Sequence, residues 1–172
     1  MVYTMRIYTD GGCRGNGKPG AIGAAAAVFS LKYGRNDSWS RLLPQSPPPT
    51  NQRAEITGII IALEQALAKR ENLETSPRLD VQIYSDSRYA VDCMTTWIYK
   101  WTRNGWINSA GDEVANRDLL EEASHLDDDL QEVGCVEYKW IPREQNQGAD
   151  RLCNERMDEQ SRVSSSDSDS DW

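Results

Sequence analysis

The proline-rich stretch "PQSPPPT" at residues 44–50 divides the chain into two parts with different hydrophobic periods. Because proline lacks a backbone N–H, this stretch cannot continue a sheet and is predicted to be a loop. Before it, residues 2–10, 21–34 and 35–43 alternate apolar with polar side chains, which is typical of strands. The turn signal "YGRND" separates the last two of these. The first part therefore predicts an antiparallel meander of three strands.

After the loop, helical and strand periods alternate. A helix is expected to begin at Asn51, with Thr50 or Asn51 as its cap, and to end between Leu67 and Arg70. Two further strands and three further helices are predicted: strands at 79–86 and 135–142, and helices at 87–101, 116–133 and 146–160. This order predicts an α/β fold, with a mixed five-stranded sheet of three antiparallel strands followed by parallel ones and helices on both faces.

Length and composition indicate one globular domain over residues 1–158 and an acidic, serine-rich tail over residues 159–172. The tail has almost no apolar residues and is predicted to be disordered. It could solubilise the chain or be a phosphorylatable segment that binds a partner. The net charge of −8 argues against a nucleic-acid partner, but the tail carries part of it. The placement of charges must therefore decide.

The sequence also excludes several classes of protein. Its four cysteines lie far apart and form no CxxC pair, which favours reduced thiols over a disulfide frame or a zinc site. No stretch approaches the roughly 18 apolar residues of a membrane helix. The first ten residues are predicted to form a strand and not a signal or transit peptide. We expect an intracellular protein of the cytoplasm or nucleus, without a membrane partner.

Four carboxylates stand at the ends of predicted elements. Asp10 and Asp86 end strands, while Glu55 and Asp150 lie in the first turns of helices. Each has an ordinary explanation alone, because acids complement a helix N-terminus and aspartate is common before turns. Strand ends that flank a crossover are also where α/β proteins build sites. Carboxylates packed together would raise one another's pKa, and divalent cations, Mg²⁺ or Mn²⁺ in preference to zinc, would stabilise them.

Five blocks carry a resemblance to type 1 ribonuclease H that runs from Arg6 to Arg156. In chain order they are "YTDGGCRGNG", "TNQRAEI", "IYSDSRYAVD", "WIYKWTRNGWINSAGDEVANRDL" and "WIPREQNQGADRL". The third and fourth blocks are especially similar to the eukaryotic cellular enzymes. The resemblance implies a ribonuclease H-like fold. It also implies an endonuclease that cuts the RNA strand of RNA–DNA hybrids and leaves 3′-hydroxyl and 5′-phosphate ends.

By position, Asp10, Glu55, Asp86 and Asp150 match the four catalytic carboxylates of that family. The resemblance implies that they bind two Mg²⁺ ions, for which Mn²⁺ can substitute. It implies that Asp10 is shared by both ions, that Asp150 helps to hold the ion that activates water, and that Glu55 and Asp86 hold the other. Two such ions activate the attacking water and stabilise the leaving oxygen.

The resemblance also implies two sets of substrate contacts. Asn16, Asn51 and Gln52 match positions that contact the RNA strand, and neutral polar groups of this kind suit 2′-hydroxyls. The matching DNA-strand positions are a phosphate pocket and a channel lining: Thr50 and Asn116 for the pocket, and Tyr89, Trp97, Trp101 and Ser109 for the channel. Aromatic rings interleaved with Lys100 and Arg103 suit stacking and phosphate attraction. Alternatively, "RGNGKPG" is only a hairpin turn, and Trp97 or Trp106 belongs to a core stripe.

The chain departs from the family pattern in three places. Pro48 replaces an arginine that is common in the phosphate pocket, and the region around Trp97 has few lysines. The segment 140–150 is short and lacks the histidine of many members, which resembles a subgroup that works without it. The one histidine, His125, is predicted to lie on a helix surface and not to move protons. A non-catalytic hybrid-binding protein of the same fold and another ribonuclease H-like nuclease remain as alternatives, and we expect a monomer.

Overall fold

The computed structural model describes residues 1–31 and 36–168, and it contains one five-stranded sheet in the order β3-β2-β1-β4-β5. β1 to β3 are antiparallel, whereas β1, β4 and β5 are parallel. This confirms the predicted mixed sheet, although most of the predicted turn before β3 lies outside the described residues. The strands are β1 Val2–Arg14, β2 Ile22–Ser30, β3 Asn36–Leu42, β4 Arg78–Ser85 and β5 Gly134–Trp140.

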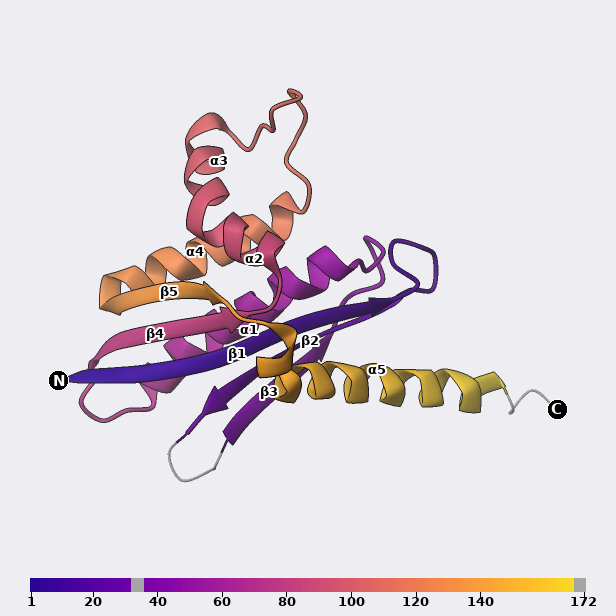
Figure 1. Cartoon of the computed structure of the whole chain (residues 1–172), viewed down its shortest axis with the longest axis horizontal. Helices are drawn as coiled ribbons and strands as arrows, with labels where there is room; N and C mark the ends of the chain where they lie inside the picture. The colour runs from indigo at the N-terminus through magenta and orange to yellow at the C-terminus, as the bar shows by residue number, and fades with distance from the viewer. Residues whose placement is uncertain (32–35, 169–172) are drawn as a thin grey trace.

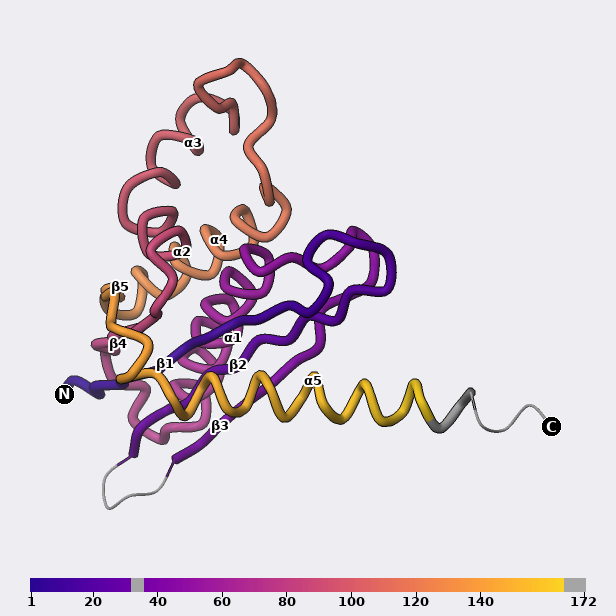
Figure 2. The backbone as a smooth tube through the Cα atoms, turned by 45° about the vertical axis from the view of Figure 1, so that its right-hand side comes forward, coloured from indigo at the N-terminus to yellow at the C-terminus, as the bar shows by residue number. Residues whose placement is uncertain are grey.

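Helices cover both faces of the sheet (Figures 1 and 2). α1 (Asn51–Glu71) packs on β1 and β2 and against α4 (Arg117–Val133), while α5 (Gln147–Ser168) crosses the opposite face over β1 and β2. The remaining helical segments are α2 (Arg88–Asp92), η2 (Cys93–Trp97), α3 (Ile98–Asn104) and the short η3 (Arg143–Gln145). Figure 1 shows α3 and the loop after it standing away from the sheet as an arm.

The main hydrophobic core lies between the sheet and α1 with α4. Alternate residues of β4, Leu79, Val81 and Ile83, face it and are fully buried. α1 is buried almost all round between residues 54 and 63, because the sheet covers one side of the helix and α4 covers the other. Burying apolar surface in this way is the main source of stability, at about 25 cal/mol per Å². The site described below is therefore built on rigid elements.

Two predicted elements differ from those in the structure. β1 does not end at Asp10 but continues to Arg14, because Gly11 and Gly12 pair with Ala25 and Ala24 of β2. The predicted helix at 87–101 has a wider π turn in its middle, at η2. It ends at Asn104, where Gly105 adopts a left-handed conformation.

The last helix is longer than predicted. We predicted that it ends at Gln160 and that disorder begins at Glu159, but α5 continues to Ser168. Serine hydroxyls donate to carbonyl oxygens of the preceding turn and support these last turns: Ser161 to Met157, Ser164 to Gln160, and Ser165 to Ser161. α5 therefore runs past the predicted boundary at Glu159, and residues 169–172 lie outside the described part of the chain.

Two predictions about the class of protein can be compared with the structure. All four cysteines are free, which confirms that they form no disulfide frame. Within the described residues, no helix has the length and apolar character that a membrane span needs.

Candidate active site

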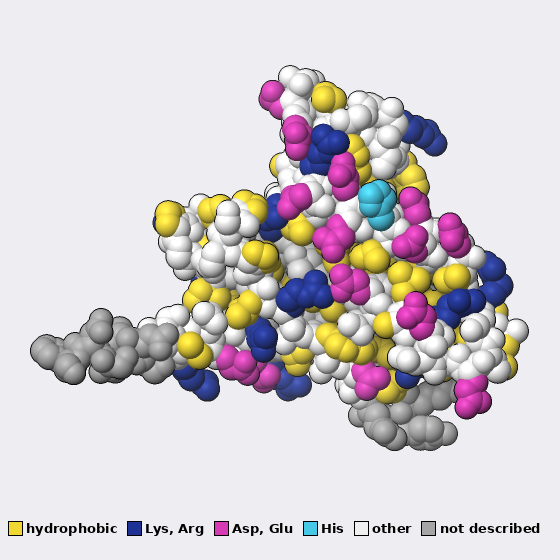
Figure 3. Space-filling model, turned by 180° about the vertical axis from the view of Figure 1, so that it is seen from behind, with side chains coloured by type: hydrophobic (Ala, Val, Ile, Leu, Met, Phe, Trp, Pro, Cys, Tyr) yellow, Lys and Arg dark blue, Asp and Glu magenta, His cyan; other side chains and the backbone are white. Residues whose placement is uncertain are grey.

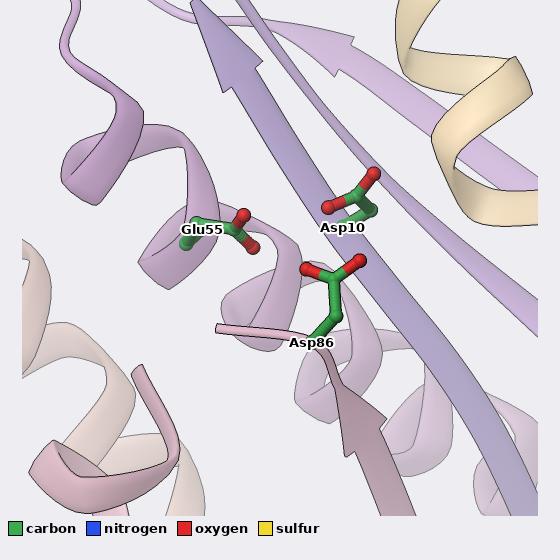
Figure 4. A group of neighbouring side chains, drawn as sticks. All are labelled: Asp10, Glu55 and Asp86. Carbon is green, nitrogen blue, oxygen red and sulfur yellow. The ribbon is translucent and has the colours of Figure 1, made fainter. Parts of the chain in front are cut away.

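Three carboxylates meet where β4 ends. One oxygen atom from each of Asp10, Glu55 and Asp86 lies within 4.8 Å of the other two. Asp10 belongs to β1, Glu55 to α1, and Asp86 directly follows β4. Figure 4 shows the three carboxylate groups pointing toward a common centre. The structure thus brings together three of the four acids on which the sequence analysis depended.

The pairing of β1 with β4 places Asp10 beside Asp86. The last pair between these strands is Thr9 opposite Ser85, and the two aspartates are the next residues on each strand. From Asp10 onward, β1 keeps only its pairing with β2. Asp10 therefore lies where β1 loses one neighbouring strand, and not at the strand end as we predicted. The side of β1 that has lost its neighbour is open to ligands.

Two glycines allow α1 to approach β1 closely at this point. A β-carbon on Gly11 would lie 2.1 Å from the carbonyl carbon of Ala54, and one on Gly58 would lie 2.8 Å from the carbonyl oxygen of Asp10. The backbones of helix and strand are therefore in direct contact, which brings Glu55 beside Asp10. Glu55 lies in the second turn of α1, because the helix begins at Asn51. Our placement of Glu55 in the first turn, and the helix-dipole explanation with it, is wrong.

Asp150 approaches the group from the opposite face of the sheet. It lies in the first turn of α5, as predicted, and its N–H donates to the carbonyl oxygen of Asn146 at 3.1 Å. Asp150 is not one of the three acids within 4.8 Å of one another. It lines a cleft of about 400 Å³ that Asp10 and Glu55 also line. The cleft is lined by Asp10, Gly11, Gly12, Cys13, Arg14, Asn51, Glu55, Arg143, Asp150, Asn154 and Met157.

Burial and mutual repulsion make the charged forms of these acids costly. Burial, followed by the charges of Asp86 and Asp150, raises the pKa of Asp10 to about 7. Burial, followed by the charges of Asp10 and Asp86, raises the pKa of Glu55 to about 10. Among the described residues, Oε2 of Glu55 is buried and has no hydrogen-bond partner. The fold therefore holds together carboxylates that it does not neutralise.

This donor set fits a divalent metal ion. The ligands are hard carboxylate oxygens, without thiols or imidazoles, which suits Mg²⁺ or Mn²⁺. A cation would offset the repulsion between Asp10, Glu55 and Asp86 and would give the orphaned oxygen of Glu55 a partner. In this chain, therefore, the acidic group is suited to be a metal site.

Sequence reasoning assigned no role to the residues that hold Asp86 in place. Asn146 is 1 % exposed, and its Nδ2 donates to the carbonyl oxygen of Thr9 at 2.8 Å and to Oδ2 of Asp86 at 3.4 Å. Nε1 of Trp140 donates to the carbonyl oxygen of Asp86 at 3.1 Å, and the Arg88 guanidinium lies 3.9 Å from the Trp140 ring centre. Asn146 is in a quoted block, but asparagine before a helix has an ordinary explanation as a cap.

Of the predicted RNA-strand residues, Asn51 lines the cleft, and Asn16 and Asn51 both have structural roles. Oδ1 of Asn16 accepts from the N–H of Asn51 at 2.8 Å, and Oδ1 of Asn51 accepts from the N–H of Cys13 at 3.0 Å. These bonds join the end of β1 to the start of α1. Thr50 caps α1, because its hydroxyl accepts from the N–H of Arg53 at 3.1 Å. The amide nitrogens of Asn16 and Asn51 take no part in these bonds.

Asn116, a predicted DNA-strand residue, contacts one residue of each predicted set. Nδ2 of Asn116 donates to the Tyr89 hydroxyl at 2.9 Å and approaches Oε1 of Gln52 at 3.4 Å. Asn116 precedes α4 in a left-handed conformation with φ of 62°. The structure therefore places Gln52, near the start of α1, next to Asn116, which directly precedes α4.

Three tryptophans, Trp97 of η2, Trp101 of α3 and Trp106 of the loop after it, form a row in which the first two rings are stacked and the third is tilted. Ring centres are 6.1 Å apart between Trp97 and Trp101 and 6.2 Å apart between Trp101 and Trp106. Trp97 is 46 % exposed, whereas Trp106 is 7 % exposed and belongs to the core. The alternative of a core stripe thus holds for Trp106 and not for Trp97. Ser109 is exposed in the loop after α3.

Comparison with known proteins identifies the family. Residues 3–162 match the family model described as RNase H. A ribonuclease H of Erythrobacter litoralis is 31% identical over 161 residues, which cover 91% of this chain and 98% of that protein. One from Acidithiobacillus ferrooxidans is 35% identical over 159 residues, covering 90% and 88% of the two chains.

A solved structure, LC11-RNase H1 in complex with an RNA/DNA hybrid, shares the fold with a TM-score of 0.64. It is 24% identical, and the match covers 90% of this chain and 97% of that one. Both the strand topology and the sequence therefore agree with the resemblance carried by the five blocks. The chain belongs to the ribonuclease H family of enzymes.

Proposed function

We propose that the protein is an endoribonuclease that hydrolyses the RNA strand of RNA–DNA hybrids and leaves 3′-hydroxyl and 5′-phosphate ends. The observation that carries the proposal is the group of Asp10, Glu55 and Asp86, with its orphaned buried oxygen, at the open end of a ribonuclease H sheet. The complex of LC11-RNase H1 with an RNA/DNA hybrid supports the choice of substrate.

In this proposal, Asp10, Glu55, Asp86 and Asp150 hold two Mg²⁺ ions. Such ions lower the pKa of the attacking water and stabilise the leaving oxygen during displacement at phosphorus. The raised pKa values of Asp10 and Glu55 support this assignment, since both acids would ionise readily only beside a cation. Asp150 and Glu55 line the same cleft, which is consistent with a ligand set that surrounds the reacting phosphate.

The reaction is a hydrolysis at one phosphodiester. The oxygen of a water molecule bonds to phosphorus, the bond from phosphorus to the 3′ oxygen breaks, and that oxygen takes up a proton. The chain contributes by holding its acids in fixed positions. Asn146 and Trp140 bond the carboxylate and the main chain of Asp86, so this group does not have to reorganise during the reaction.

Two sets of side chains would distinguish the strands. Neutral donors and acceptors at the cleft would read the 2′-hydroxyls of the RNA, and the arm and the α4 N-terminus would hold the DNA strand. The contact between Gln52 and Asn116 supports this, because the two strands face each other across the minor groove and adjacent residues could contact one strand each. The proposed contacts are Asn16, Asn51 and Gln52 for RNA, and Thr50, Tyr89, Trp97, Trp101, Ser109 and Asn116 for DNA.

Residues 1–158 form the catalytic domain in this proposal, and the enzyme acts as a monomer. The pair between Arg14 and Asp158, at 2.8 Å, ties α5 to the end of β1 beside the cleft, whereas α5 continues beyond Asp158 away from the body (Figure 2). A chain that ends at Asp158 is therefore expected to cut hybrids at the rate of the full chain. A large loss of rate would show that the later turns of α5 contribute to the site.

Substrate choice tests the proposal against its rivals. The same labelled RNA strand is incubated with the protein and Mg²⁺ in three forms: as a single strand, as an RNA duplex, and as a hybrid with DNA. Internal cuts confined to the hybrid would support the proposed function. A non-catalytic hybrid-binding protein would bind the hybrid and leave the RNA intact. Release of mononucleotides from one end would indicate an exonuclease of the same fold.

A further inference from the structure

The free edge of β5 borders a groove whose lining contains none of the acids of the cleft. β5 is the last strand of the sheet, and within the described residues only β4 pairs with it. The groove beside its other edge has a volume of about 330 Å³. Its walls are Met94, Thr95 and Tyr99 on one side and residues 136–139 of β5 on the other. A strand edge exposes main-chain N–H and C=O groups that can pair with another extended chain.

Tyr99 separates this groove from a second cavity. Its ring is 53 % exposed, although Trp97 and Trp101 on the same helical segment stack on each other. The second cavity, of about 120 Å³ between α3 and α4, is lined by Ile98, Tyr99, Thr102, Ser124, Asp127 and Asp128. An aromatic ring, two hydroxyls and two carboxylates form a lining that suits a guanidinium group.

Within the described residues, no basic side chain forms an ion pair with either of the two carboxylates of this cavity. Asp127 accepts a hydrogen bond of 2.5 Å from the Tyr138 hydroxyl, and burial raises the pKa of this carboxyl. Neither Asp127 nor Asp128 forms an ion pair within the described part of the chain, whereas Glu121 is paired with Arg117 on the same helix. A cation supplied from outside would therefore find two unpaired carboxylates.

The surroundings favour a basic protein segment over a nucleic acid. Figure 3 shows acidic side chains gathered around the one histidine, which belongs to α4, on a face that also carries lysine and arginine side chains elsewhere. Acidic residues along α4 outnumber its one arginine, Arg117: they are Asp118, Glu121, Glu122, Asp127, Asp128, Asp129 and Glu132. Such a surface repels phosphates and attracts cations over several ångströms. The proposed substrate would therefore leave this face free.

We propose that an extended, arginine-bearing segment of a partner protein docks along the free edge of β5. The segment would add to the sheet as a strand, with Met94 and Tyr99 beside it, and would place a guanidinium in the cavity between α3 and α4. Main-chain pairing would supply affinity, and the cavity would supply specificity. This surface is separate from the acids of the cleft, so the proposal does not depend on the proposed function.

Binding of a designed peptide to the full chain tests the proposal. The probe is a short fluorescent peptide that alternates valine with arginine, and binding is followed by anisotropy and by amide NMR shifts. We expect a Kd in the range of about 1–100 μM and shifts at residues 136–139. A peptide with N-methyl groups on its pairing edge should bind at least about tenfold more weakly, because it cannot pair with β5.

Matched variants separate the cavity from general attraction. Tyr99→Ala and Asp128→Lys should each weaken binding by about tenfold, and Asp129→Lys, the same charge change outside the cavity, by less than about twofold. Cutting of hybrids should be unchanged in Asp128→Lys and Asp129→Lys. Equal losses for Asp128→Lys and Asp129→Lys, or shifts at the tryptophan stack instead of β5, would overturn the proposal. A protein dimer that Tyr99→Ala dissolves would overturn the choice of occupant in favour of a second copy.

Discussion

The main-chain oxygen of Asp10 lies directly over Gly58, at a position where a β-carbon would come within 2.8 Å of it. This contact sets the distance between β1 and α1, and with it the distance between the acids that the two elements carry. The geometry of the site is thus determined partly by a residue that has no side chain. A prediction follows for each part of this arrangement.

Gly58→Ala should push α1 away from β1. Overpacking typically costs about 1–3 kcal/mol, more than alanine gains over glycine in a helix, so the free energy of unfolding should fall. Hybrid cutting at low Mg²⁺ should fall further than at saturating Mg²⁺. Urea unfolding and Mg²⁺ titration of activity measure the two effects. Gly148→Ala is the control, because nothing lies within 4 Å of its β-carbon position, and a loss of equal size there would contradict the explanation.

Asp10→Asn should stabilise the metal-free protein while abolishing activity. Because the folded-state pKa of Asp10, about 7, exceeds its ordinary value of 3.8, the folded state binds protons more tightly than the unfolded state. The free energy of unfolding should therefore fall as pH rises from about 4 to about 7, by roughly 1–3 kcal/mol. Asp10→Asn should remove much of this fall.

Urea unfolding in EDTA at several pH values measures the effect, and added Mg²⁺ should reduce the fall in the wild type. Asp92→Asn, at an exposed position on α2, is the control and should leave the pH profile unchanged. An unchanged profile in Asp10→Asn would mean that the carboxylates do not repel one another in the folded state.

Asn146→Ala should impair the reaction more than it impairs substrate binding. The variant loses the hydrogen bonds to Thr9 and Asp86, so Asp86 becomes free to reorient. Loss of a residue that orients a metal ligand typically costs about 10–100-fold in activity or metal affinity. Steady-state kinetics should show a lower kcat with little change in KM, and a higher Mg²⁺ concentration at half-maximal rate. A change in KM alone would place Asn146 in substrate contact instead.

The arm separates binding from stability, because its tryptophans differ in burial. Trp97→Ala should raise the KM for hybrids with little effect on Tm, since this ring is half exposed. Trp106→Ala should cost about 3–5 kcal/mol of stability, since that ring belongs to the core. Thermal unfolding and kinetics of both variants check this. Normal KM in a folded Trp97→Ala protein would remove Trp97 from the proposed DNA channel.

The order of the strands and helices, and the identity of the acids at the site, could be predicted from the sequence. The local geometry around those acids could be predicted only in part. Hydrophobic period alone located all five strands, and the proline-rich loop correctly separated the meander from the alternating part. Asp10 was misplaced because "DGG" resembles a turn, whereas Gly11 and Gly12 extend the strand by pairing with the alanines of β2. Such pairing depends on a distant segment and leaves no local signal.

Other features of the site were missed or misplaced because they also depend on contacts between distant parts of the chain. Glu55 was assigned one turn too early, although Thr50, which caps the helix, was one of the two caps predicted. The π turn at η2 has no marker in its residues. The role of Asn146 could not be predicted, because its partners Thr9 and Asp86 are distant in sequence.

The most direct measurement is the cutting of one hybrid by two proteins. A hybrid with end-labelled RNA is incubated with the wild type and with Asp10→Asn, in Mg²⁺ and in EDTA, and the product ends are identified by enzymatic extension and ligation. We predict internal cuts that require both Mg²⁺ and Asp10, with 3′-hydroxyl and 5′-phosphate ends. Intact RNA with the folded wild type, or equal cutting by Asp10→Asn, would contradict a metal-dependent site built on these carboxylates.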